Sequence, residues 1–362
     1  MPTLAHSRRS RCPRRRPARR ASGSRIYSSA RTRADPMPMC AGAPALSNSR
    51  AQRIGSPPAG MRIRPPPTKA RSVRSTRRRC MWSESNVAQQ VRYGPRLIAH
   101  PTDRLRSALL IAPNAAMERV APLQSEPSAI FSRAAEQHAT LVKTLQYFGV
   151  ETRVVDAHDR AAFAACANDL AVVFENGAVI MRPHDLDRRA ETDLVRAQFD
   201  EIDIPTSGEI AVPGLLDGSD VLLAGNTAFI GVSKRSNAIG RAGLAQIAAA
   251  NGYRAVDVKL TADAPCLRSV ANTVAPGTVV IAPDKVDGAA FEGFDLIELE
   301  RGEDLGAGFL TIGQNHILCD VRYSFAHAQL RKTGIAVEAI DLYEFGKLGI
   351  TPTQLVLPLR RR

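Results

Sequence analysis

Long apolar runs are missing from this 362-residue chain, and their absence excludes several classes of protein. No stretch approaches the roughly 18 consecutive apolar residues that a transmembrane helix needs, and no apolar signal-peptide core is visible. The six cysteines include no CxxC pair and no Cys/His cluster at metal-ligand spacing. We therefore expect no membrane association, no bound metal and no cofactor, in a reduced, cytoplasmic compartment.

Positive charge is concentrated at the start of the chain. Residues 1–80 contain 21 of the 49 Lys and Arg residues but only one of the 35 acids. This segment therefore carries +20 and the remaining residues carry −6, which together give the formal charge of +14. A segment so rich in Arg, Pro and Ser, with hardly any apolar runs, cannot offset its ordering entropy, and we predict a disordered leader.

Several interpretations of the leader stay open. Its Arg- and Ser-rich, acid-poor composition is typical of an organellar transit peptide. Arginine clusters at 14–16 and 77–79 suit phosphate contacts to nucleic acid, or contacts to anionic lipid. We favour an open reading frame that starts too early, with the true start near Met81, because the composition changes abruptly there.

The chain after the leader is predicted to form one folded domain. Residues 81–94 are interpreted as a linker and residues 95–362 as a single α/β domain, a size that closed α/β folds often reach. This part is mildly acidic and carries no basic stripe, so we expect no nucleic-acid binding through the folded domain.

Short apolar runs alternate with helical patterns along residues 95–362. The predicted strands are 107–112, 152–155, 170–174, 178–181, 221–223, 228–230, 278–282, 309–312, 316–319 and 335–338. The predicted helices are 128–148 (beginning at Ser128), 185–199, 236–250 and 324–333. Turns at 176–177, 225–226 and 313–315 indicate three hairpins. A hairpin-helix-strand unit thus recurs three times, which suggests a pseudo-symmetric ring, although the pattern alone establishes only α/β.

Several motifs resemble one enzyme family. They are Leu216-Asp217-Gly218-Ser219-Asp220-Val221, Gly231-Val232-Ser233-Lys234-Arg235-Ser236-Asn237, and Arg182-Pro183 followed by Arg188-Arg189-Ala190-Glu191. Together they resemble the dimethylargininase (dimethylarginine dimethylaminohydrolase) branch of the guanidine-modifying, amidinotransferase superfamily. The resemblance covers residues from about 95 to 360. It implies a five-bladed α/β propeller (the pentein fold) and hydrolysis of arginine or methylated arginine to citrulline plus an amine.

The resemblance also implies a substrate shell. A guanidinium group is held by carboxylates, and an amino-acid carboxylate is held by cations. Asp169 and Asp217 match the guanidinium-binding acids, Asp217 also being catalytic, while Asn168 replaces a glutamate. Arg188 and Arg235 match contacts to the substrate carboxylate. The alternative is that the acids are ordinary turn residues and Arg188 lies on a solvated helix face.

The two reactive positions of the family are substituted. Cys266, in Cys266-Leu267-Arg268-Ser269, aligns with the general acid/base histidine, and Gln354 aligns with the nucleophilic cysteine. A glutamine cannot form the covalent intermediate that a thiolate forms. Cys266 could act as a relocated nucleophile, but a buried inert thiol is the expectation we favour. No other histidine lies in a segment that matches the site, and His184, His316 and His327 are interpreted as structural or exposed rather than catalytic.

Three functions follow from these residues. The first is a dimethylargininase-like hydrolase. The second is a catalytically silent protein that binds a guanidino or amino-acid ligand on the same scaffold. The third is a structural member of the fold class that binds a macromolecule, which no motif specifically supports. Loss of both reactive residues favours the second function. The expected partner is then a small guanidino or amino-acid molecule. A homodimer is also possible.

Overall fold

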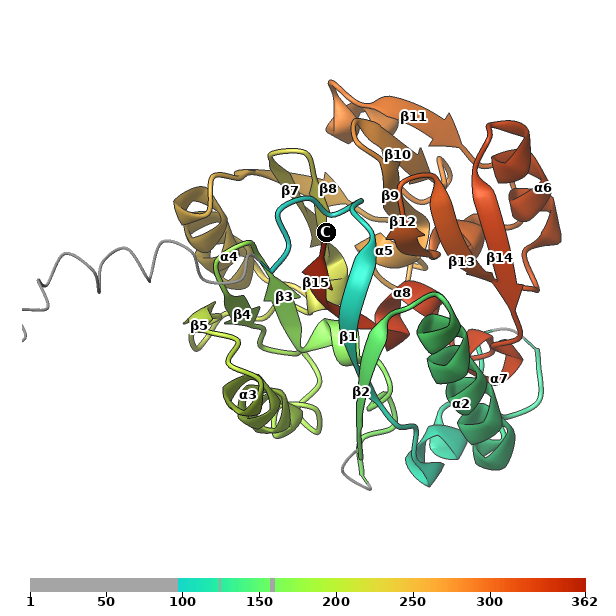
Figure 1. Ribbon diagram of the computed structural model, residues 1–362, viewed down its shortest axis with the longest axis horizontal. Coiled ribbons are helices and arrows are strands. Elements are labelled where there is room, and N and C mark those ends of the chain that lie inside the picture. Colours follow the sequence, from blue (N-terminus) through green and yellow to red (C-terminus); the bar gives the residue numbers. More distant parts are fainter. Residues whose placement is uncertain (1–96, 124, 157–159) are drawn as a thin grey trace, which may run out of the picture. The chain divides into compact units, whose positions relative to one another are not determined.

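Five three-stranded sheets form the architecture of the chain where the structure describes it (Figure 1). This computed structural model describes residues 97–123, 125–156 and 160–362. The expectations for the leader (1–80) and for the linker (81–94) lie outside the described residues. No helix in the described ranges is long and apolar enough to cross a membrane.

All five sheets share one strand pattern, in which an antiparallel pair is extended by a parallel third strand. The first strands are β3 (Ala171–Val173), β6 (Val221–Ala224), β9 (Ala271–Ala275), β12 (Leu310–Gly313) and β15 (Leu357–Arg361). The middle strands are β4 (Ala178–Ile180), β7 (Thr227–Val232), β10 (Thr278–Ile281), β13 (His316–Asp320) and β1 (Leu105–Ile111). The third strands are β5 (Thr206–Glu209), β8 (Arg254–Lys259), β11 (Asp295–Glu298), β14 (Ala336–Ile340) and β2 (Glu151–Val155).

A crossover connects each middle strand to the third strand of its sheet. Four crossovers contain an α-helix: α2 (Phe131–Tyr147), α3 (Glu191–Glu201), α4 (Ala238–Ala250) and α6 (Ser324–Lys332). The crossover from β10 to β11 contains only a 3-10 turn, η4 (Gly288–Phe291). The short elements η1 (Ala115–Arg119) and α7 (Tyr343–Gly346) complete the outer part. Each of the four crossover helices buries one face, as an amphipathic pattern predicts.

The two ends of the described chain close the fold. Strand β15 pairs antiparallel with β1, so the sheet that contains β1 and β2 takes its first strand from the C-terminus. This pairing replaces the hairpin that the other four sheets contain. The predicted five-bladed pseudo-symmetric α/β propeller is confirmed, with five repeats rather than the three recognised in the sequence.

The hydrophobic core lies between neighbouring sheets. Strand β6 shows why: Val221 and Leu223 pack into one apolar cluster, whereas Leu222 and Ala224 pack into the next. Side chains alternate across a strand, so a strand buried on both faces reads as a continuous apolar run. Aromatic contacts add to this core, with the Phe229 and Phe291 ring centroids 4.7 Å apart.

Three helices begin later than the sequence indicated, α4 by two residues and α2 and α3 by more. Helix α2 begins at Phe131 instead of Ser128, and its preceding residue, Ile130, has no capping side chain. The free amides of its first turn are bound from elsewhere: Ile130 N donates to Glu344 Oε2 at 2.8 Å and Phe131 N to Glu118 Oε1 at 2.7 Å. Helix α3 begins at Glu191 rather than at residue 185. At α2, carboxylates from outside the helix thus take the place of the Ser128 cap on which the prediction relied.

Five short helical turns lie at the ring centre, one before each first strand. They are η2 (Ala167–Asp169), η3 (Gly218–Asp220), α5 (Leu267–Val270), η5 (Asp304–Ala307) and α8 (Pro352–Leu355). Neighbouring turns contact one another, for example η2 with η3 and α8 with η2. Residues at matching places in these turns are far apart in sequence and are brought together by the fold.

Candidate ligand site at the ring centre

The central turns carry the residues that the motifs singled out. Asp169 ends η2, Asp217 directly precedes η3, Cys266 directly precedes α5, and Gln354 lies within α8. The motif Asp217-Gly218 has a steric basis, because a Cβ added at Gly218 would lie 2.1 Å from the Asn168 carbonyl oxygen. Glycine at this position lets η3 lie directly against η2, which brings the Asp217 and Asp169 segments together.

Arg188 is held in buried ion pairs. Its Nη1 donates to Asp169 Oδ2 at 2.5 Å, its Nε donates to Glu191 Oε2 at 2.9 Å, and its Nη2 donates to the Cys166 carbonyl at 2.9 Å. Burial acts to lower the pKa of Arg188, but the nearby negative groups, Asp169 foremost, together outweigh it and raise that pKa above its ordinary value. All three guanidinium nitrogens are thus engaged within the protein.

Arg235 lies between the two acids. Its Nη1 is 3.5 Å from Asp169 Oδ2 and 3.5 Å from Asp217 Oδ2. The Asp217 carboxylate makes no hydrogen bond to the first turn of η3, which a simple turn-capping acid would make. Burial acts to lower the pKa of Arg235, whereas the carboxylates, Asp169 foremost, raise it. Arg235 therefore bridges two buried acids through long, weak contacts.

Two polar atoms of this cluster are buried without a hydrogen-bond partner in the described part of the chain. They are Asp169 Oδ1, an acceptor, and Arg235 Nε, a donor. Buried polar groups are nearly always satisfied, by protein, water or ligand. An acceptor and a donor that are both unsatisfied, in one charged cluster, are complementary to a small molecule carrying a donor group and an acceptor group.

His184, which the sequence did not link to the site, contacts this cluster. Its backbone N donates to Asp217 Oδ1 at 2.9 Å, and its Nδ1 lies 3.1 Å from Asp217 Oδ2. A histidine beside a carboxylate is a common acid/base arrangement. The sequence signal that could have located it is its position directly after Arg182-Pro183, within a motif shared with the guanidine-modifying enzymes.

Gln354 and Cys266 each form hydrogen bonds that cap a short helix. Gln354 Oε1 accepts hydrogen bonds from Thr351 N at 3.0 Å and from Thr351 Oγ1 at 3.1 Å, which closes a capping box at the start of α8. Cys266 forms the equivalent capping box with Ser269 at the start of α5. Burial raises the pKa of the Cys266 thiol to about 11, so it is protonated at neutral pH.

Asn168 lies apart from the acid cluster. Its Oδ1 accepts a hydrogen bond from Arg268 Nη1 at 3.1 Å, and both residues border a cavity that Asp169 does not line. The structure thus brings together Asp169, Asp217, Arg188 and Arg235, while Asn168 faces Arg268 instead.

Asp220 gives the ring centre a pH-dependent element. It is fully buried, and burial raises its pKa to about 7, although Ser233 Oγ and Leu267 N both donate to its carboxylate. The folded protein therefore holds a proton at Asp220 that the unfolded chain has released between about pH 4 and pH 7. The stability that this proton provides is full below about pH 4 and is lost as the pH rises through 7.

We expect Asp220→Asn to remove this pH dependence. Over pH 4.5–7 the unfolding free energy of the unmodified protein should fall, relative to the variant, by at most about 1.4 kcal/mol per pH unit. Urea denaturation of both proteins across that range measures the difference. Parallel pH profiles for the two proteins would show that Asp220 is ionised in the fold throughout.

Comparison with known proteins identifies the family. A dimethylarginine dimethylaminohydrolase of Streptomyces coelicolor is 32% identical over 231 residues, which are 63% of this chain and 86% of that protein. The chain belongs to the dimethylarginine dimethylaminohydrolase family. Membership confirms the resemblance of the motifs. No family profile matches the chain.

Solved structures of guanidine-modifying enzymes share the fold. The dimethylarginine dimethylaminohydrolase of Pseudomonas aeruginosa, solved with citrulline, superposes with a TM-score of 0.65 at 20% identity, covering 70% of this chain and 99% of that one. The N-terminal domain of a cyanobacterial arginine dihydrolase, ArgZ, solved with its substrate, gives a TM-score of 0.62 at 16% identity, covering 70% and 98%. These similarities extend over residues of the propeller and confirm its fold class.

Proposed function

We propose that this member of the dimethylarginine dimethylaminohydrolase family binds a small guanidino or amino-acid ligand at the ring centre and does not hydrolyse it. The observation that carries the proposal is the contrast within one site. The charged residues Asp169, Asp217 and Arg235 remain, with an unsatisfied acceptor and an unsatisfied donor among them. The two positions that match reactive residues of the family hold Gln354 and Cys266.

The binding half of the proposal follows from charge and geometry. A guanidinium group donates hydrogen bonds in a planar fork, and a pair of carboxylates is its best partner. Arg235 Nη1 is 3.5 Å from both Asp169 Oδ2 and Asp217 Oδ2, and hydrogen bonds of this length are weak. A ligand guanidinium can therefore take these acceptors while Arg235 moves toward the ligand carboxylate. The relatives solved with citrulline and with an arginine dihydrolase substrate support this class of ligand.

The proposal that the bound ligand is not hydrolysed rests on the lack of a nucleophile. Attack on a guanidinium carbon requires a thiolate or an equally strong nucleophile. The amide of Gln354 is not nucleophilic, and its oxygen is already bonded to Thr351. The Cys266 thiol holds its proton at neutral pH because it is buried. We infer that neither side chain attacks a bound ligand.

The His184–Asp217 contact favours a second candidate function, a hydrolase with relocated catalysis. In that function Cys266 would supply the nucleophile and His184 the acid/base. The raised pKa of Cys266 weighs against it, because the thiolate fraction at neutral pH is very small.

A turnover assay separates the two candidates. We expect no citrulline above background from arginine or methylated arginine, at high protein concentration, from the unmodified protein. Citrulline formation that disappears in both Cys266→Ala and His184→Ala would establish relocated catalysis instead. The exposed residue His100 offers a matched control, since His100→Ala should change nothing in either case.

A further inference from the structure

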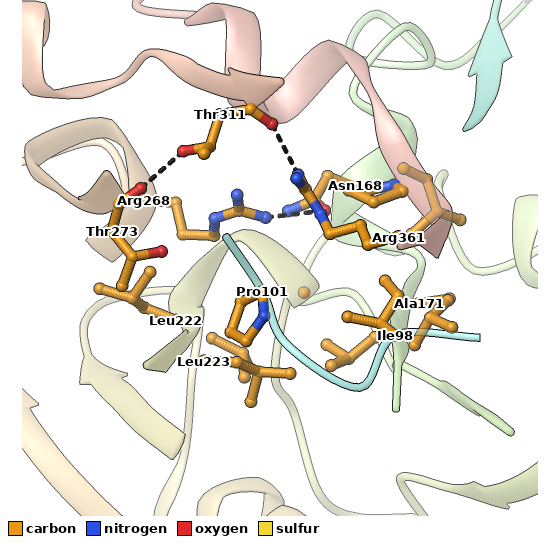
Figure 2. A pocket seen from close by; sticks show the side chains of 16 residues that line it. Ile98, Pro101, Asn168, Ala171, Leu222, Leu223, Arg268, Thr273, Thr311 and Arg361 are labelled. Atoms are coloured by element: carbon orange, nitrogen blue, oxygen red, sulfur yellow. Dashed lines mark hydrogen bonds between the residues drawn. The ribbon is translucent and has the colours of Figure 1, made fainter. Parts of the chain in front are cut away.

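The cavity that Asn168 borders lies on the axis of the propeller, next to the central turns. It has a volume of about 50 Å³ and is lined by residues of all five first strands, β3, β6, β9, β12 and β15. Figure 2 shows its two ends: apolar side chains such as Ile98, Pro101 and Leu223 surround one, and Arg268 and Arg361 lie at the other with Asn168 and Thr311. The acid cluster around Asp169 does not line it.

The polar end of this cavity holds two guanidinium groups whose hydrogen bonds go to neutral amide and carbonyl oxygens. Arg268 donates from Nη1 to Asn168 Oδ1 at 3.1 Å and from Nε to Asn272 Oδ1 at 3.2 Å. Arg361, only 4% exposed, donates to two backbone carbonyls, of Asp103 at 2.9 Å and of Thr311 at 2.8 Å. Within the described ranges neither arginine forms an ion pair with a carboxylate.

The two cations also act on each other. Burial lowers the pKa of Arg268 to about 10. Burial together with the nearby Arg268 cation lowers the pKa of Arg361 to about 9, although the Asp103 carboxylate acts in the opposite direction. Both remain charged at neutral pH. Charges buried in pairs of like sign are unfavourable unless a counter-charge joins them.

Unused hydrogen-bond donors surround the same end of the cavity. Each guanidinium has five N–H donors and uses two of them in the contacts above, so several remain on each. The Asn168 amide nitrogen, also at the cavity wall, is buried and has no acceptor among the described residues. Two cations and an unpaired amide donor make a set that only an acceptor-rich anion satisfies.

We propose that this axial cavity binds a small oxyanion between Arg268 and Arg361. A volume of about 50 Å³ is several times what one water needs, and far less than a nucleotide or an amino acid requires. An ion of phosphate or sulfate size fits, and its oxygens accept from both guanidinium forks. The apolar walls at the other end lower the local dielectric and strengthen the attraction. This site is separate from the proposed ligand site, and neither depends on the other.

Thermal unfolding at pH 7 and constant ionic strength tests the oxyanion site. The melting temperature of the unmodified protein should rise saturably as phosphate is added. It should not rise when chloride is added instead. Arg268→Gln should weaken the apparent phosphate affinity by about ten- to a hundred-fold, since it removes charge-assisted hydrogen bonds. Arg254→Gln, which removes the same charge from an exposed side chain, should not. An equal rise with chloride, or the same phosphate response in both variants, overturns the proposal.

A measurement on the unmodified protein covers the case in which Arg268→Gln does not fold. Crystals soaked in selenate should give an anomalous peak within hydrogen-bonding distance of both Arg268 and Arg361. Selenate bound elsewhere only, or nowhere, contradicts the proposal. Titration with arginine in place of phosphate tests the ring-centre site instead, so failure of one proposal is distinguishable from failure of the other.

Discussion

Arg188→Met should destabilise the protein by roughly 3–5 kcal/mol. The substitution keeps the bulk of the side chain but removes its charge, which leaves the Asp169 carboxylate buried without the 2.5 Å partner that now neutralises it. It also removes the donor to the Cys166 carbonyl. Losing one partner of a buried pair costs far more than losing the pair, because an uncompensated charge stays in a low-dielectric interior.

Arg196→Met is the matched control for Arg188→Met. Arg196 lies on α3, which follows Arg188, and pairs with Glu209 at 2.9 Å, but the Arg196 side chain is partly exposed and that of Glu209 mostly exposed. Exposed pairs contribute about 0–1 kcal/mol, so this variant should unfold close to the unmodified protein. Urea denaturation midpoints of the three proteins give the comparison. Similar small losses in both variants would mean that Arg188 is free to bind a ligand carboxylate, the role that the motif implied.

Asp217→Asn and Arg235→Gln should weaken ligand binding in different ways. A buried charge-assisted hydrogen bond is worth roughly 1.5–3 kcal/mol, so losing one lowers affinity about ten- to a hundred-fold. Asp217→Asn should weaken every guanidinium-bearing ligand. Arg235→Gln should weaken arginine far more than agmatine, which has the guanidinium but no α-carboxylate. Calorimetric titration of each variant with both compounds measures the four affinities.

The control for these binding variants is the surface pair Arg241–Asp257, 3.0 Å apart. Asp257→Asn makes the same chemical change as Asp217→Asn away from the ring centre and should leave both affinities unaltered. If Arg235→Gln lowers the affinities for arginine and agmatine equally, Arg235 does not contact the ligand carboxylate. Unchanged binding in both site variants would place the ligand elsewhere on the protein.

Many strands and helices could be predicted from the local pattern of apolar residues. The strands and repeats that were missed depend on contacts between residues far apart in the sequence. Strand β6 was evident because burial on both faces demands a continuous apolar run. Strand β9, Ala271–Ala275, was missed because its small and polar residues carry no such signal and pair with β10 only in the folded ring. Two of the five repeats escaped notice for related reasons. One has a 3-10 turn where the others have a helix, and one is assembled from both ends of the described chain.

The candidate site was predictable as a set of residues but not as an arrangement. The motifs located Asp169, Asp217, Arg188 and Arg235, and the fold brings all four together. That Arg188 pairs with Asp169 nineteen positions away depends on how the segment before α3 turns inward, which no local rule describes. The contact of His184 with Asp217 and that of Asn168 with Arg268 are likewise products of the ring.

Isothermal titration of the unmodified protein with arginine and with dimethylarginine tests the central claim most directly, because calorimetry registers binding and turnover in one experiment. The account predicts saturable heats that return to the baseline after every injection: a ligand is bound and nothing is consumed. A sustained displacement of the baseline after injection would show continuing hydrolysis and contradict the silent half of the account. No heat of binding at millimolar ligand would contradict the other half.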